Sequence, residues 1–227
     1  MSATNEIPKS EFYHDRIVTA LVMCSIIWAV LGMAAGVYVA AELVWPTLDF
    51  GEPWLSFGRL RNLHTNVVIF GFGVSALMGT AFYSVQRTCH VPLFLPRLAW
   101  FVFIAWQIIL LLGGLSLLAG ITSGKEYAEL EWPFDIAIAL VWVCFGIVFF
   151  GTIACRKIKP IYVSNWFYGG LIIVITMIHV VNSLAMPATL FKSYSLFAGA
   201  QDAILQWWYG HNAVGLLLTG GFLGMMY

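Results

Sequence analysis

The stretch LAWFVFIAWQIILLLGGLSLLAGITSG, residues 98–124, decides the fold because none of its residues carries a charged side chain. A helix needs about 20 predominantly apolar residues to cross the roughly 30 Å hydrocarbon core of a bilayer. In lipid, each backbone N–H and C=O must find its partner within the segment. The stretch therefore predicts a transmembrane α-helix.

The rest of the chain repeats this pattern. The other stretches without Asp, Glu, Lys or Arg are residues 17–41, 62–86, 136–155, 160–191 and 203–227. The chain is 61% hydrophobic and 10% charged, whereas soluble domains carry about 25% charged residues. We predict an all-α integral membrane protein with six transmembrane helices. Residues 1–16 are a tail too polar for a signal peptide, and residues 17–227 form one domain without repeat or linker.

Basic residues are unequally divided between the two sets of loops. The tail and the loops after the second and fourth runs hold Lys9, Arg16, Arg87, Arg97, Arg156, Lys157 and Lys159, and the opposite loops hold Arg59, Arg61, Lys125 and Lys192. The positive-inside rule predicts a cytoplasmic N-terminus. The sequence stops at Tyr227, within the sixth run, so we expect it to be the N-terminal part of a longer membrane protein.

Several classes of function find no support in the sequence. The net charge is zero and no basic run suggests binding to nucleic acid. The four cysteines form no C-x-x-C pair, which argues against a thiolate zinc site and against covalently attached heme. There is no Ser-His-Asp order, phosphate-binding glycine loop or H-E-x-x-H motif, so hydrolase and nucleotide chemistry are not indicated.

Ionisable residues inside a membrane mark function because they are costly there. His64 begins the second run, and neutral imidazole is a ready ligand for iron or copper. The neighbouring Arg59 and Arg61 suit acidic groups such as heme propionates, and Gly71 in the same run admits either a flat macrocycle or a neighbouring helix. The alternative is an interface histidine bonded to a backbone carbonyl.

Two further histidines lie in apolar runs. His211 lies nine positions past Asp202, about 13 Å of helix into the bilayer, so it needs a partner or a metal. We expect Asn212 to bond across to a neighbouring helix, and a structural hydrogen bond remains the alternative for His211. His179 lies deep in the fifth run, three residues before Asn182, and favours a polar contact between helices.

The loop GKEYAELEWPFD places Glu126, Glu129 and Glu131 close together. Oxygen-rich loops suit a hard cation such as calcium. A solvated acidic loop is the alternative, and composition favours it. Trp132 and Pro133 then fit the start of a helix, since proline is accepted in the first turn.

Four motifs together resemble one family. FGRLRNLHTNVVIFGFGVSALMGTAFYSVQRT, GKEYAELEWPFDIAIALVWV, IYVSNWFYGG and QWWYGHNAVGLLLTGGFLGMMY are similar to segments of subunit I of the cbb3-type cytochrome c oxidases, in the family's order. The resemblance implies the first half of a twelve-helix heme–copper oxidase subunit in the bacterial inner membrane. It also implies reduction of dioxygen to water by electrons from cytochrome c, coupled to proton translocation. The implied partners are other oxidase subunits, including membrane-anchored c-type cytochromes.

The resemblance also implies cofactors and their ligands. The family's subunit holds a low-spin heme b, a high-spin heme b3 and a copper ion. It implies that His64 is an axial ligand of heme b, His211 one of three copper ligands, Glu126 a calcium ligand and Arg61 a partner of a heme propionate. The remaining ligands of the family lie beyond Tyr227. We therefore predict that this chain alone is not an active oxidase.

Three alternatives compete with this interpretation. In nitric oxide reductases, which are related, a glutamate typically stands where this chain has Tyr209, so Tyr209 favours copper and dioxygen. A non-catalytic membrane cytochrome b would use His64 and His179 as its two axial ligands. A transporter or scaffold would use the histidines only for packing.

Overall fold

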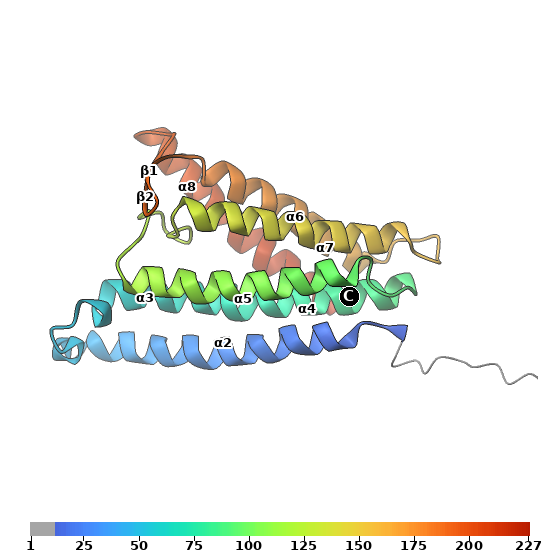
Figure 1. Cartoon of the computed structure of the whole chain (residues 1–227), viewed down its shortest axis with the longest axis horizontal. Coiled ribbons are helices and arrows are strands. Elements are labelled where there is room, and N and C mark those ends of the chain that lie inside the picture. Colours follow the sequence, from blue (N-terminus) through green and yellow to red (C-terminus); the bar gives the residue numbers. More distant parts are fainter. Residues whose placement is uncertain (1–11) are drawn as a thin grey trace, which may run out of the picture.

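The computed structural model describes residues 12–227, so most of the predicted tail, residues 1–11, lies outside the described residues. Its principal elements are α2 (Asp15–Glu42), α3 (Phe57–Asn66), η3 (Val67–Val74), α4 (Ser75–Cys89), α5 (Pro96–Leu118), α6 (Trp132–Ala154), α7 (Val163–Asn182), β1 (Ala185–Thr189), β2 (Lys192–Ser195), α8 (Ala200–Asn212), η4 (Ala213–Gly220) and α9 (Gly221–Met226). Two short 3₁₀ turns, η1 (Pro46–Asp49) and η2 (Pro53–Leu55), join α2 to α3. The elements form a bundle of long helical rods (Figure 1).

The predicted all-α membrane architecture is confirmed. Five rods are long and apolar enough to cross a membrane: Asp15–Glu42, Phe57–Cys89, Pro96–Leu118, Trp132–Ala154 and Val163–Asn182. The sixth run forms the consecutive segments α8, η4 and α9, which completes the expected six. Side chains that face outward, such as Ile27, Val30 and Ile104, are large, apolar and more than half exposed. A surface of this kind fits lipid as its solvent.

The second and sixth rods each contain a π-helical segment. In the second rod η3 separates α3 from α4, and in the sixth η4 separates α8 from α9. Each segment is rich in glycine and aliphatic residues, VVIFGFGV and AVGLLLTG. Such wide turns are rare and are frequent at functional sites.

Aromatic side chains fill the centre of the bundle. Phe82 of α4 meets Phe145 of α6 edge to face, with ring centroids 5.2 Å apart. Trp142 and Phe145 pack in the same way at 5.7 Å, and Phe149 of α6 packs on Tyr168 of α7 at 6.2 Å. All five side chains are almost fully buried. Edge-to-face pairs stabilise such contacts beyond the area that they bury, so α4, α6 and α7 form a fixed frame.

Helix boundaries depart from the charge-free runs in two places. The third rod ends at Leu118 and residues 119–131 form a loop, in which Gly120 adopts a φ of +80°. The fifth rod ends at Asn182, and residues 185–195 form an antiparallel β-hairpin in place of the predicted helix. Pro187 lacks the N–H that a helix interior needs. We call the end of the bundle that carries this hairpin and the 119–131 loop the hairpin end (Figure 1).

Candidate functional site

His64 lies in the last turn of α3 with its ring turned toward α2. Its Nδ1 atom lies 2.7 Å from the carbonyl oxygen of Gly32. Among the described residues, its Nε2 atom makes no hydrogen bond. Histidines that bind metals almost always donate the other ring N–H to a carbonyl, a carboxylate or water. The contact with a backbone carbonyl, predicted as the alternative to ligation, is therefore also what a ligand needs, and the site fits an axial ligand of heme iron.

The His64 ring rests on the backbone of α2 at a second glycine. A Cβ atom placed on Gly36 would lie 2.5 Å from Cε1 and 2.8 Å from Nδ1 of His64. Gly32 is likewise close to the second rod, since its Cβ would lie 2.8 Å from a methyl group of Val68. The two glycines form the G-x-x-x-G pattern of closely packed membrane helices, GMAAG. That pattern is the signal in the sequence from which this contact is predictable.

Arg61 and Glu126 form an ion pair at the hairpin end. The distance between Nη2 of Arg61 and Oε1 of Glu126 is 2.5 Å, and the side chains are 47% and 42% exposed. The family resemblance implies a propionate for Arg61 and calcium for Glu126, and the structure brings the two side chains together. Calcium takes six to eight oxygen ligands, and within residues 12–227 no three His, Cys, Asp or Glu side chains gather around one point, so the residues described do not by themselves fit calcium.

Glu129 and Glu131 correct the expectation of a solvated acidic loop. Their residues are only 3% and 1% exposed. Glu129 accepts a hydrogen bond of 2.9 Å from Asn66, and Glu131 accepts one of 2.7 Å from Ser193 of the hairpin. Burial raises the pKa of Glu129. The expectation was wrong because α3 and the hairpin cover the loop, and only Glu126 matches it.

His211 lies near the end of α8 and is exposed on the described bundle. It lies two residues before η4, and His64 lies three residues before η3. The amide of Asn212 donates to the carbonyl of Trp208 one turn earlier at 2.6 Å, and the bond to a neighbouring helix stays a prediction. Tyr209 is buried and its hydroxyl donates to the carbonyl of Tyr127 at 3.1 Å. An exposed imidazole on a helix suits a metal ligand.

His179 lies in the last turn of α7, at the hairpin end, and not deep within a span. Its Nε2 atom lies 3.0 Å from the backbone carbonyl of Asp135 in α6. The predicted polar contact between helices is thus confirmed. The His64 ring faces α2 and the His179 ring faces α6, so the two histidines do not meet as a pair of axial ligands.

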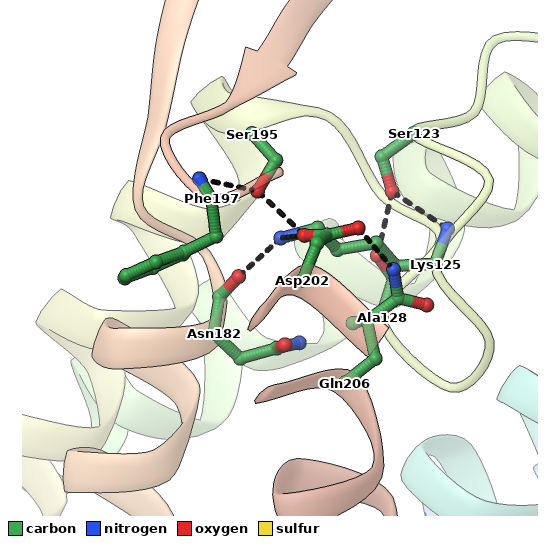
Figure 2. Close-up of polar contacts among 8 residues, drawn as sticks. All are labelled: Ser123, Lys125, Ala128, Asn182, Ser195, Phe197, Asp202 and Gln206. Carbon is green, nitrogen blue, oxygen red and sulfur yellow. Dashed lines mark hydrogen bonds and ion pairs between the residues drawn. The ribbon is translucent and has the colours of Figure 1, made fainter. Parts of the chain in front are cut away.

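A polar cluster under the hairpin was not predicted. Lys125 is 9% exposed, and its ammonium group donates to the carbonyl of Asn182 at 2.5 Å (Figure 2). It also lies 3.9 Å from the carboxylate of Asp202, which accepts bonds of 2.7 Å from Ser195 and Gln206. Burial lowers the pKa of Lys125. Lys125, Asp202 and Ser195 are among the residues that line a polar cavity of about 110 Å³, large enough for water.

A second, mostly apolar cavity of about 60 Å³ lies among the helices next to the polar one. Its lining residues include Trp106, Trp142 and Leu217, and also His179 and Tyr209. Asp135 lines both cavities. The buried polar groups at the hairpin end therefore border two cavities, one polar and one mostly apolar.

Comparison with known proteins agrees with this architecture. Residues 16–227 match the family described as Cytochrome C and Quinol oxidase polypeptide I. The chain is 57% identical over 218 residues to "Cbb3-type cytochrome c oxidase subunit CcoN1" of Stutzerimonas stutzeri, covering 96% of this chain and 46% of that protein. It is 51% identical over 225 residues to "Cytochrome c oxidase subunit 1" of Rhodobacter capsulatus, covering 97% of this chain and 42% of that one.

The chain thus spans less than half the length of these relatives. Heme and copper are the cofactors that the family implies, and its setting is a multi-subunit complex in the bacterial inner membrane. The matched region includes all six helical rods, both π-helical segments and every candidate ligand. The chain belongs to the heme–copper oxidase subunit I family and resembles its cbb3-type members.

Proposed function

We propose that this chain is the N-terminal half, residues 17–227 with a short tail, of the catalytic subunit of a cbb3-type terminal oxidase. The complete subunit reduces dioxygen to water with electrons from cytochrome c and couples the reaction to proton translocation. The observation that carries the proposal is the His64 ring, whose Nδ1 is held by the Gly32 carbonyl while Nε2 makes no bond within the described residues. The names of the relatives favour an oxidase over a nitric oxide reductase or a simple cytochrome b.

Each candidate residue has a distinct task in this proposal. His64 binds the iron of low-spin heme b, and His211 supplies one of three copper ligands beside a high-spin heme b3. These cofactors, when bound, carry the electrons and bind oxygen. The chain's own part is to hold the imidazoles, to keep water out of the apolar interior and to place charges near the heme edges. Arg61 neutralises a propionate, and Glu126 contributes one oxygen to a calcium site that other parts of the complex complete.

The distribution of basic residues supports the orientation that we propose. The N-terminus lies in the cytoplasm, so the hairpin end, with Arg61, Glu126 and the buried acids, faces the outer side. The chain assembles with the remainder of its subunit and with membrane-anchored c-type cytochromes, which pass on electrons from cytochrome c.

The test is His64→Ala in the complete oxidase complex, with His90→Ala as the matched control. His90 is exposed in a loop at the opposite end of the bundle. We expect His64→Ala to remove the optical bands of the low-spin heme and to abolish oxygen consumption with reduced cytochrome c, and His90→Ala to leave both intact. A His64→Ala complex that keeps the low-spin bands would contradict the proposal.

A further inference from the structure

Two features of α2 hold the His64 ring: the backbone carbonyl of Gly32 and the absence of a side chain at Gly36. The Gly32 carbonyl lies within α2, where it also accepts the N–H of Gly36 one turn later. A carbonyl oxygen has two lone pairs, so the second is open to the His64 Nδ1–H at 2.7 Å.

Access to this lone pair depends on residue 36. In an α-helix the Cα–Cβ bond tilts toward the N-terminus, so a side chain at position 36 would lean back over the carbonyl of residue 32. Gly36 has no such side chain. The imidazole occupies the space, since Cε1, Nδ1 and Nε2 would lie 2.5, 2.8 and 3.2 Å from an added Cβ.

We propose that Gly36 is a positioning residue for His64, which leaves the Gly32 carbonyl uncovered so that this carbonyl fixes the proton on Nδ1 and turns Nε2 toward the heme iron. The proposal rests on the ligand role proposed above for His64. A hydrogen bond from Nδ1 makes Nε2 the stronger electron donor and fixes the plane of the ring. Ligand strength and nearby hydrogen bonds set the reduction equilibrium of heme iron. Helix α2 thus tunes the heme although it supplies no ligand.

An alanine at position 36 has a predictable effect on the ring. The added Cβ would begin 2.5 Å from Cε1, whereas carbon atoms in contact lie about 3.5 Å apart, so the ring edge must move by about 1 Å. A shift of this size lengthens the bond to Gly32 beyond hydrogen-bonding range. Nε2 then becomes the weaker donor, and the ferrous heme is favoured.

The experiment compares Gly36→Ala with Gly170→Ala in the complete, heme-loaded oxidase complex. Gly170 is a helical glycine of α7, and no atom lies within 4 Å of its added Cβ. The readouts are the electron paramagnetic resonance spectrum of the low-spin ferric heme and its reduction equilibrium in a redox titration. Outer partners of metal-binding histidines typically change affinity or activity by about 10- to 100-fold. Because the carbonyl itself remains in Gly36→Ala, we expect the lower end of this range. The reduction equilibrium should shift about tenfold toward the reduced heme, and the low-spin resonances should change. Gly170→Ala should match the wild type.

The outcomes separate this inference from the function on which it rests. A wild-type complex without a low-spin heme overturns both. A wild-type low-spin heme with unchanged resonances and reduction equilibrium in Gly36→Ala overturns the inference alone. Where Gly36→Ala does not assemble, pulsed resonance spectroscopy of the wild type in H₂O and D₂O decides. An exchangeable, hydrogen-bonded proton on the remote nitrogen of His64 supports the inference, and its absence overturns it.

Discussion

Replacing Lys125 by methionine tests the polar cluster that fastens the hairpin to the helices. Methionine keeps most of the volume of the lysine side chain and removes its charge. The ammonium group now donates to the carbonyl of Asn182 at the end of α7 and lies 3.9 Å from Asp202 at the start of α8. Lys125→Met therefore releases two helix ends from one side chain.

The expected cost follows from these contacts. Hydrogen bonds from charged donors contribute about 1.5–3 kcal/mol, and the Asn182 carbonyl is left without this donor. Losing one partner of a fully buried ion pair costs about 3–5 kcal/mol. Asp202 is 24% exposed and keeps the donors Ser195 and Gln206. Loss of the Lys125–Asp202 ion pair should therefore cost only about 1 kcal/mol. Removing a buried ammonium returns part of its desolvation cost, and we expect a net loss of about 2 kcal/mol.

The measurement is hydrogen exchange of the hairpin amides, residues 185–195, in the detergent-solubilised complex. A loss of about 2 kcal/mol corresponds to roughly 30-fold faster exchange where exchange follows local opening. Lys159→Met is the control, since Lys159 is exposed at the opposite end of the bundle. Unchanged hairpin exchange in Lys125→Met would refute the reasoning. A double-mutant cycle with Asp202→Asn isolates the ion pair, and strictly additive effects would assign the loss to the Asn182 bond alone.

Three further outcomes are expected. Tyr209→Phe removes the buried bond to the Tyr127 carbonyl and should lower thermal stability by about 1–3 kcal/mol without loss of copper, measured by melting and by metal analysis; a loss of copper would contradict this. Because the pKa of Glu129 is raised in the folded state, the unfolded chain loses its proton first as pH rises, so the free energy of unfolding should fall with pH above the ordinary carboxyl range. Glu129→Gln should flatten that part of the melting profile, and an unchanged slope would argue against it. The chain expressed alone should consume no oxygen with reduced cytochrome c, and measurable consumption at an oxygen electrode would refute that.

The sequence predicted the parts of this fold that depend on local composition. Charge-free runs located six rods, and Trp132–Pro133 marked the start of α6, because apolar length and proline geometry act within a segment. The hairpin escaped prediction because Leu184 and Phe191 continue an apolar run that Pro187 interrupts. Burial of Glu129 depends on Asn66, which is 63 residues away in the sequence. Contacts of that kind are set by packing between rods, which no local pattern reports.

The difference between local patterns and contacts between helices also explains which properties of the candidate ligands the sequence predicted. Residue type and family motif singled out His64 and His211, whereas the direction of the His64 ring depends on α2, which contributes no polar side chain to it.

The two candidate ligand helices share one further feature that links sequence to geometry. In each, the histidine stands on a regular α-helical turn and a π-helical segment of eight residues follows. Every residue that a wide turn adds rotates the following side chains by about 100° relative to a regular helix. In the second rod the regular turn and the π-helical segment still face the same neighbour, since the His64 ring and Val68 of η3 both lie against α2. Gly71 of η3 packs against the Trp28 ring of α2 and allows a close approach of the two helices, whereas no atom lies within 4 Å of a Cβ added to Gly215 or Gly220 of η4.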